Sequence, residues 1–178
     1  MGHDDITERV RDAIQSYHNF PKKGIIFRDL LPVLRKPELF DDLTDYLCDK
    51  IHEKVPGVKA VVGLEARGFL LGPVIALKLK VPFVPIRKVG KLPGSVRKVS
   101  YSLEYGMDSF EIQTEALNYG EEVIIIDDLL ASGGTMQAAV QLLQDCGVIV
   151  AESLVIIELT ELNGREKISV PFFSVLQI

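Results

Sequence analysis

Two adjacent carboxylates stand directly before a short glycine-rich turn in the stretch DDLLASGGT, from Asp127 to Thr135. Gly133 and Gly134 would let backbone N–H groups at a helix start approach an anion closely, while hydroxyls of Ser132 and Thr135 add donors. The pattern predicts a phosphate site, although an ordinary tight turn capped by Ser or Thr has a similar sequence. Because carboxylates repel an anion, Asp127 and Asp128 are expected to have a role other than binding the phosphate.

The elements around this turn predict where it lies. Val123 to Ile126 is an apolar run typical of a buried strand that ends near Asp127 or Asp128, and a helix is expected from about Thr135 to a stop at Gly147. The run VIVAESLVII then predicts another strand. The turn is therefore expected at the carboxyl end of a parallel strand, where open α/β sheets bind ligands.

A similar strand–helix–strand order occurs earlier in the chain. KAVVGL and PFVPI have the length and composition of strands, and the helix-like stretch FLLGPVIALKLK separates them. Two such units predict an α/β fold with a mostly parallel, twisted sheet flanked by helices. Upstream, one helix is expected to begin at Pro37, and another is expected to present Ile6, Val10, Ala13, Ile14 and Tyr17 on one face.

The polar segment between the two units does not fit this alternation. Val99, Tyr101 and Leu103 alternate with polar residues, and apolar positions resume at Phe110 after a turn at Gly106. This pattern predicts a β-hairpin. A long excursion of this kind is often a lid, which we expect at about residues 94–113.

The composition of the chain excludes several classes of protein. The 178 residues are expected to form a single domain, 1–178, and the net charge of −5 argues against nucleic-acid binding. The two cysteines, in apolar helical patterns, are expected to be reduced thiols of a cytoplasmic protein, and no apolar run is long enough for a membrane span. The Walker and GxGxxG phosphate loops are absent, and the three histidines lack metal-ligand spacing.

The stretch VIIIDDLLASGGT resembles the phosphoribosyl pyrophosphate (PRPP) signature of the type I phosphoribosyltransferases. The resemblance implies that Asp127 and Asp128 bind the ribose hydroxyls while the turn binds the 5′-phosphate through Ala131, Ser132, Gly133, Gly134 and Thr135. It also implies the fold of that family, with an N-terminal hood at about 1–35 and a flexible hairpin lid. Mg²⁺ would be held by PRPP and water rather than directly by the protein.

Further stretches are similar to the family members that use adenine, from FPKKGIIFRDLLPVL to ELTELNGREKI. This resemblance implies a purine pocket in which Phe27, beside Ile26 and Arg28, stacks on the base and Leu159 covers its other face. Taken alone, Phe27 could equally be a core residue. Stacking on an aromatic side chain contributes about 1–3 kcal/mol per base.

The stretch GLEARGFLLGP is implied to form the pyrophosphate loop. Its Glu65–Ala66 peptide is often cis in the family, and Arg67 would face the leaving group as a binding and catalytic residue. Arg87, Lys88 and Lys91 form a basic cluster that is otherwise typical of a solvated surface. In the family, part of that cluster neutralises pyrophosphate across a homodimer interface.

In YSLEYG, Glu104 matches the family's proposed general acid/base, and Tyr105 would help to seal the lid. The resemblance therefore implies transfer of the phosphoribosyl group of PRPP to N9 of adenine, giving AMP and pyrophosphate. Arg97 and Lys98 lie in a part of the lid that varies among members. The alternatives are a PRPP-sensing regulatory protein of the same fold and a PRPP synthetase, which would be longer and carry an ATP site.

Overall fold

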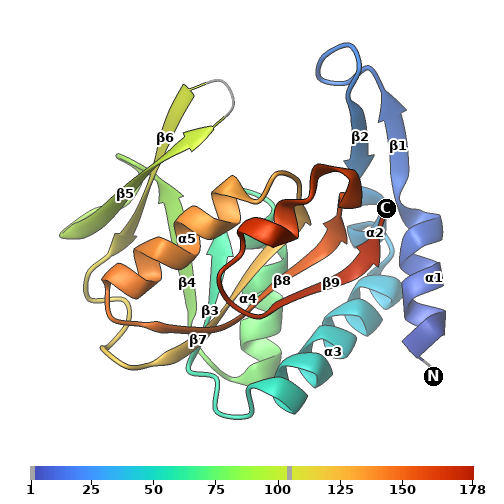
Figure 1. The fold of residues 1–178 in the computed structure, drawn as a ribbon. Helices are drawn as coiled ribbons and strands as arrows, with labels where there is room; N and C mark the ends of the chain where they lie inside the picture. Colours follow the sequence, from blue (N-terminus) through green and yellow to red (C-terminus); the bar gives the residue numbers. More distant parts are fainter. Residues whose placement is uncertain (1–2, 104–105) are drawn as a thin grey trace. The chain divides into compact units, whose positions relative to one another are not determined.

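The computed structural model describes residues 3–103 and 106–178, and the chain divides into two compact units, Met1–Lys50 and Ile51–Ile178. The first unit contains α1 (His3–Ala13), β1 (Gln15–His18), β2 (Ile26–Asp29), α2 (Leu31–Leu34) and most of α3 (Pro37–Lys54). The helix expected at Pro37 is confirmed. The expected helical face through Tyr17 is wrong, because α1 ends at Ala13 and Tyr17 pairs with Phe27 in the antiparallel β1–β2 ladder (Figure 1).

The described part of the second unit is built on a seven-stranded sheet with the order β5-β6-β4-β3-β7-β8-β9. Five neighbouring strands, from β4 to β9 in that order, are parallel, and the antiparallel hairpin β5–β6 extends the sheet beyond β4. The strands are β3 (Ala60–Leu64), β4 (Phe83–Lys88), β5 (Val96–Leu103), β6 (Gly106–Gln113), β7 (Glu122–Leu130), β8 (Ile149–Glu158) and β9 (Phe172–Gln177). The expected mostly parallel α/β sheet is confirmed.

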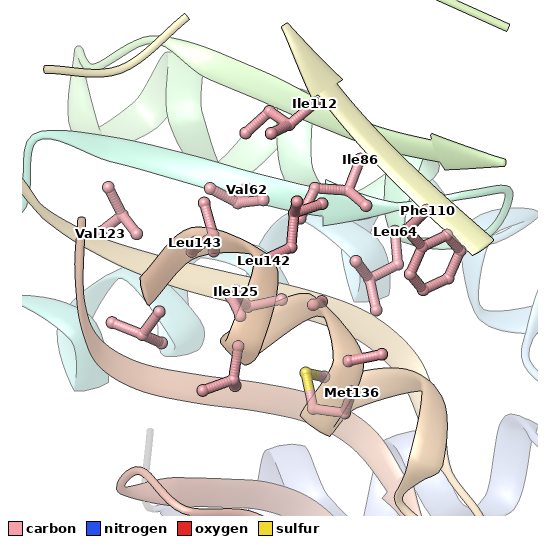
Figure 2. Packing of buried hydrophobic residues seen from close by; sticks show 14 of the residues in the cluster. Val62, Leu64, Ile86, Phe110, Ile112, Val123, Ile125, Met136, Leu142 and Leu143 are labelled. Atoms are coloured by element: carbon pink, nitrogen blue, oxygen red, sulfur yellow. The ribbon is translucent and has the colours of Figure 1, made fainter. Parts of the chain in front are cut away.

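Helices α4 (Gly68–Leu79) and α5 (Gly134–Asp145) cover opposite faces of this sheet. Alternate residues of the central strands, such as Val62 and Ile125, point toward α5 and meet Leu142 and Leu143 (Figure 2). Since the core strands are buried on both faces, they read as continuous apolar runs. This explains why the strand–helix–strand units were visible in the sequence.

On the face covered by α4, the ring of Phe83 lies against two glycines. A Cβ atom added at Gly63 would come within 2.6 Å of that ring, and one added at Gly72 within 2.4 Å. Both distances are well below ordinary van der Waals contact, so the aromatic side chain occupies the space that two absent side chains leave. We call Gly63, Gly72 and Phe83 the glycine socket.

The hairpin β5–β6 is anchored in the core by part of its length. Phe110 and Ile112 are buried, and the Tyr101 and Phe110 rings lie 5.0 Å apart. Arg97 donates a hydrogen bond of 2.8 Å to the carbonyl of Asp145, at the end of α5. The expected hairpin at about 94–113 is therefore present, with its inward-facing side chains packed beneath α5.

Two further expectations concern the chain as a whole. Cys48 and Cys146 are not joined in a disulfide, and each is only partly buried. Among the residues described, no helix has the length and apolar character that crossing a membrane requires.

Candidate active site

A cavity of about 250 Å³ opens at the carboxyl ends of β3 and β7. The turn after β3 lines it with Glu65, Ala66 and Arg67, and the end of β7 with the following turn lines it with residues 127–136. Two stretches that are sixty residues apart in the sequence, EARG and DDLLASGGT, therefore form one site. The cavity includes Arg67, both aspartates and all five predicted phosphate-binding residues.

The strand order explains why these two turns meet. From β3 the chain crosses through α4 to β4 on one side, and from β7 it crosses through α5 to β8 on the other side. The turns after β3 and β7 consequently diverge to opposite faces of the sheet, which leaves a crevice between them. Such a switch point is where doubly wound sheets bind ligands.

The turn between β7 and α5 presents backbone donors to this cavity. Gly133 precedes α5 with φ +81°, a left-handed conformation that side chains disfavour, and no side chain caps the helix. The first N–H groups of α5 are therefore available to an anion, and the first turn contains no acidic residue. This geometry suits the terminal phosphate of a ligand.

The two carboxylates have different surroundings. Asp128 is 3% exposed, and its Oδ2 lies 2.6 Å from Nε of Arg67 in an ion pair that is not aligned as a hydrogen bond. Asp127 Oδ1 accepts a 2.9 Å hydrogen bond from the backbone N–H of Asp128. Burial, with repulsion from Asp128, raises the pKa of Asp127 well above its ordinary value. Both carboxylates retain acceptor capacity for hydroxyl groups.

The predicted basic cluster lies outside the residues that line the cavity, and its acidic partners include Glu65 of the cavity wall. Arg87 forms a two-pronged contact with Glu65, with Nη2–Oε1 at 2.6 Å and Nε–Oε2 at 3.1 Å. This pairing lowers the pKa of Glu65 and raises the pKa of Arg87. Lys88 pairs with Asp108 of β6 at 2.9 Å, and the backbone N–H of Lys91 donates to Glu111. Arg87 thus contacts the cavity wall through Glu65.

Tyr101 of the hairpin lies near residues 131–135, which we call the phosphate turn after their predicted role. Its hydroxyl lies close enough to Thr135 and to Asp108, which in turn holds Lys88, for both residues to influence the pKa of Tyr101. Burial is the main reason that the pKa of Tyr101 is raised, and the negative charge of Asp108 adds to the effect. Sequence reasoning placed Tyr101 only on the hairpin, because the contact with Thr135 depends on how α5 lies against β5.

The predicted base-recognition residues lie in both units, and each unit is described by itself. In the first unit, Ile26, Phe27 and Arg28 lie on β2, where the Phe27 ring meets the Phe20 ring edge-on at 5.2 Å. In the second unit, the partly buried Leu159 directly follows β8. Glu104 and Tyr105 lie outside the described residues. The Glu65–Ala66 peptide is cis, as the resemblance implied.

The fold, together with the DDLLASGGT stretch in which two acids precede a glycine-rich turn, defines a type I phosphoribosyltransferase. A family model described as phosphoribosyl transferase domain matches residues 33–178. The adenine phosphoribosyltransferase of Caenorhabditis elegans is 49% identical over 165 residues, which cover 93% of this chain and 89% of the relative. This chain belongs to the adenine phosphoribosyltransferase family.

Solved structures give the same result. The enzyme from Saccharomyces cerevisiae, in complex with an imino-altritol bisphosphate and adenine, has a TM-score of 0.94 and 43% identity, covering 97% of this chain and 99% of that one. An enzyme from Trypanosoma brucei, in complex with AMP, pyrophosphate and ribose-5-phosphate, has a TM-score of 0.89 and 29% identity, with coverage of 97% and 79%. Both share the fold over nearly all of this chain.

Proposed function

We propose that this protein transfers the phosphoribosyl group of PRPP to N9 of adenine, giving AMP and pyrophosphate. The observation that carries the proposal is the single cavity into which the DDLLASGGT turn and the EARG turn both open. The first turn suits a 5′-phosphate, the two aspartates suit ribose hydroxyls, and Arg67 adds a positive charge beside them. These are the three parts of PRPP, in the order in which the ligand carries them.

The chemistry follows from this placement. Adenine N9 attacks C1′ as pyrophosphate leaves, with inversion, and the transition state carries positive charge on the ribose ring. Asp127 and Asp128 stabilise that charge, while Arg67 stabilises the negative charge that develops on the leaving group. Arg87, which is paired with Glu65, and Lys91 are assigned to pyrophosphate. Lys88 is assigned to it as well, and would have to leave its partner Asp108 to reach the pyrophosphate.

The base is assigned to Ile26, Phe27, Arg28 and Leu159, and proton transfer at N7 to Glu104. Tyr105 is assigned to closing the lid, since water that reached C1′ would hydrolyse PRPP. These roles rest on the resemblance. Adenine is a component of the yeast relative's crystal complex, and AMP is a component of the trypanosome relative's complex, which supports this choice of base.

Mg²⁺ fits the site as an ion that the substrate carries. Among the residues described, no group of three or more His, Cys, Asp or Glu side chains could hold a metal. Mg²⁺ usually keeps several of its water molecules, and the carboxylates of Asp127 and Asp128 could accept hydrogen bonds from them. When bound, Mg²⁺ would neutralise charge on pyrophosphate.

We further propose a cytoplasmic homodimer with no nucleic-acid or membrane partner. The net charge of −5 supports the absence of a nucleic-acid surface. A PRPP-sensing regulator of the same fold is the alternative, and it would bind PRPP without making AMP. Sedimentation of the purified protein would measure its assembly.

The test is to incubate the protein with PRPP and Mg²⁺ and, separately, adenine, hypoxanthine, guanine or orotate. We expect AMP from adenine and at most traces of the other nucleotides. Asp128→Asn should lose most of this activity, whereas Asp12→Asn, on the exposed side of α1, should retain it. PRPP binding without AMP formation would instead support the regulator.

A further inference from the structure

We infer that Arg165, through its ion pair with Glu158, is a positioning residue that holds both the phosphate turn and Leu159 in place. The inference rests on the proposed function, because it concerns the same substrate site. Arg165 lies on η2 (Gly164–Lys167), beyond η1 (Thr160–Leu162) and outside the cavity lining. It acts through its neighbours and does not touch the substrate.

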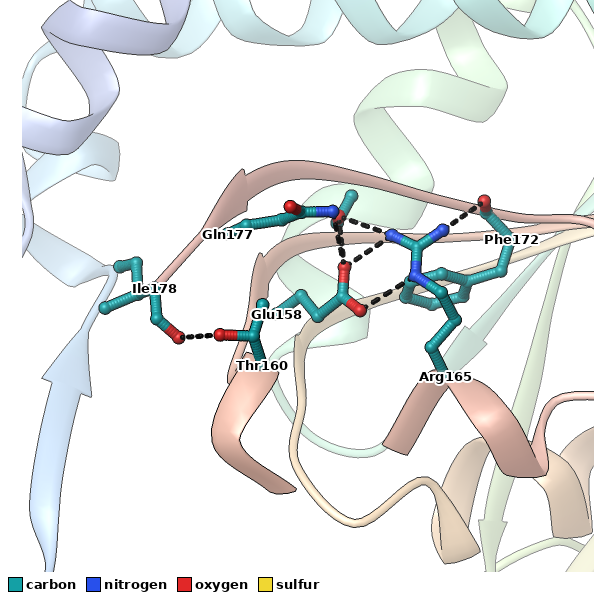
Figure 3. Close-up of polar contacts among 7 residues, drawn as sticks. Glu158, Thr160, Arg165, Phe172, Gln177 and Ile178 are labelled. Atoms are coloured by element: carbon teal, nitrogen blue, oxygen red, sulfur yellow. Dashed lines mark hydrogen bonds and ion pairs between the residues drawn. The ribbon is translucent and has the colours of Figure 1, made fainter. Parts of the chain in front are cut away.

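The ion pair is built around a buried carboxylate. Glu158, the last residue of β8, is 4% exposed, and its Oε1 accepts a 2.8 Å hydrogen bond from Nε of Arg165. Its Oε2 accepts from Nη2 of the same guanidinium and, at 2.6 Å, from the hydroxyl of Ser174 (Figure 3). The Arg165 guanidinium also lies 4.7 Å from the ring centre of Phe172. A two-pronged, partly buried pair fixes orientation as well as charge.

The main chain on both sides of Leu159 is fixed to the sheet next to this ion pair. The N–H of Leu159 donates to the carbonyl of Leu130, at the end of β7, over 2.9 Å. The carbonyl of Glu158 and the N–H of Thr160 bond to the backbone of Ile178. Since Glu158 immediately precedes Leu159, the pair with Arg165 constrains the position of the proposed base cover.

The residue before Arg165 supports the phosphate turn from behind. A Cβ atom on Gly164 would lie 2.0 Å from the carbonyl oxygen of Ala131 and 2.9 Å from the nitrogen of Gly133. A Cβ atom on Gly133 would lie 2.3 Å from the carbonyl oxygen of Gly164. The two backbones are therefore in direct contact, with no room for a side chain. Releasing Arg165 would let η2 move and remove this support.

The chain contains a matched control on the same strand. Glu152 of β8 is 1% exposed and pairs with Lys54 at 2.6 Å, and Lys54 lies over the ring of Phe173, as Arg165 lies over that of Phe172. This second pair shares the buried acid, the exposed base and the ring, but neither of its residues is adjacent to Leu159 or to Gly164, which contacts the phosphate turn. Breaking it should affect stability alone.

The experiment compares Arg165→Met with Lys54→Met. Calorimetry measures the Kd for ribose 5-phosphate, kinetics measure KM and kcat, and Tm is followed by circular dichroism. Displacement of a supporting loop by about 1 Å can cost up to a hundredfold, so we expect Arg165→Met to raise the Kd and the KM for PRPP about tenfold or more. Lys54→Met should leave both unchanged while lowering Tm comparably.

Arg165→Lys provides a second variant if Arg165→Met does not fold. It keeps the charge but loses the two-pronged contact, so an intermediate rise in Kd is expected. Unchanged Kd and KM in the folded Arg165 variants would overturn the inference. Failure of the proposed function is distinguishable, because it would appear as absence of AMP with the unsubstituted protein, whereas ribose 5-phosphate binding measures the positioning role directly.

Discussion

Asp127 and Asp128 occupy successive positions on one strand and yet face different electrostatic surroundings. Asp128 has the Arg67 guanidinium 2.6 Å away, whereas Asp127 is partly buried beside a second acid, and both conditions raise its pKa. Placing a carboxylate where its charge is disfavoured costs stability in the free protein. A substrate whose hydroxyls donate to that carboxylate offsets this cost, so stability and binding should respond in opposite directions to a substitution there.

Asp127→Asn should make the protein more stable and bind PRPP less tightly. Because the pKa of Asp127 is higher in the folded chain than its ordinary value of 3.8, the folded state binds more protons above that pH. This contribution to the free energy of unfolding therefore falls as pH rises, and Asn removes the dependence. Thermal unfolding at pH 4 and pH 8 should show the larger gain in Tm at pH 8.

The same variant should weaken ribose 5-phosphate binding about tenfold or more, since a hydrogen bond to a charged group contributes about 1.5–3 kcal/mol. Asp12→Asn, on the exposed side of α1, is the control for both measurements. A loss of stability at pH 8 in Asp127→Asn would contradict the burial argument.

Glu104→Gln should lower kcat by about a hundredfold or more, as removal of a general acid/base does, while the KM for PRPP changes little. Steady-state kinetics with adenine measure both constants. Glu115→Gln, at an exposed position after the hairpin, should behave like the unsubstituted protein. If the unsubstituted protein, Glu104→Gln and Glu115→Gln were equally active, a residue other than Glu104 would carry out the proton transfer.

At the scale of elements, the sequence predicted the parts of the fold that are apolar and regular. Core strands such as β3 and β7, buried on both faces, appear as uninterrupted apolar runs. The strand β1 is exposed at all four positions and has no such run, so nothing in its sequence distinguishes it from a continuation of the helical spacing through Tyr17. Pairing with β2 decides the conformation there.

The site residues also divide into those that a local motif predicts and those whose contacts form only in the folded chain. The phosphate turn is local, so its residues could be named from one motif. The partners Arg87–Glu65, Lys88–Asp108 and Arg165–Glu158 depend on strand register and on loops that meet only in the fold. The resemblance includes NGREK, the stretch that contains Arg165, but implies no role for this arginine, because an arginine in a polar turn is usually solvated.

Gly133→Ala should abolish ribose 5-phosphate binding and lower stability. The φ of +81° disfavours a side chain by about 1–2 kcal/mol, and the added Cβ would also meet the carbonyl of Gly164 at 2.3 Å. Gly120→Ala is the control for the effect of φ alone, because φ at Gly120 is +79° and a Cβ atom added there would have no other atom within 4 Å. Denaturant unfolding should show the greater loss for Gly133→Ala; equal losses would mean that the turn adjusts freely.

At the scale of the whole molecule, the two compact units should respond to different ligands. Ribose 5-phosphate should slow hydrogen exchange in the turn after β7, whose backbone N–H groups are assigned to its phosphate. Adenine should slow exchange at β2, where Ile26, Phe27 and Arg28 lie. Exchange measured by mass spectrometry with each ligand separately would contradict the assignment if adenine protected only the second unit.

The glycine socket has a consequence for how this sequence can diverge. Enlarging Gly63 or Gly72 by one carbon would collide with the Phe83 ring, and shrinking Phe83 alone would leave a void between α4 and the sheet. Each single change is therefore unfavourable, while a paired change that moves volume from the ring to a glycine position is much less so. We therefore expect Gly63, Gly72 and Phe83 to change together or not at all. Directed evolution of this protein would need two simultaneous substitutions to alter this part of the core.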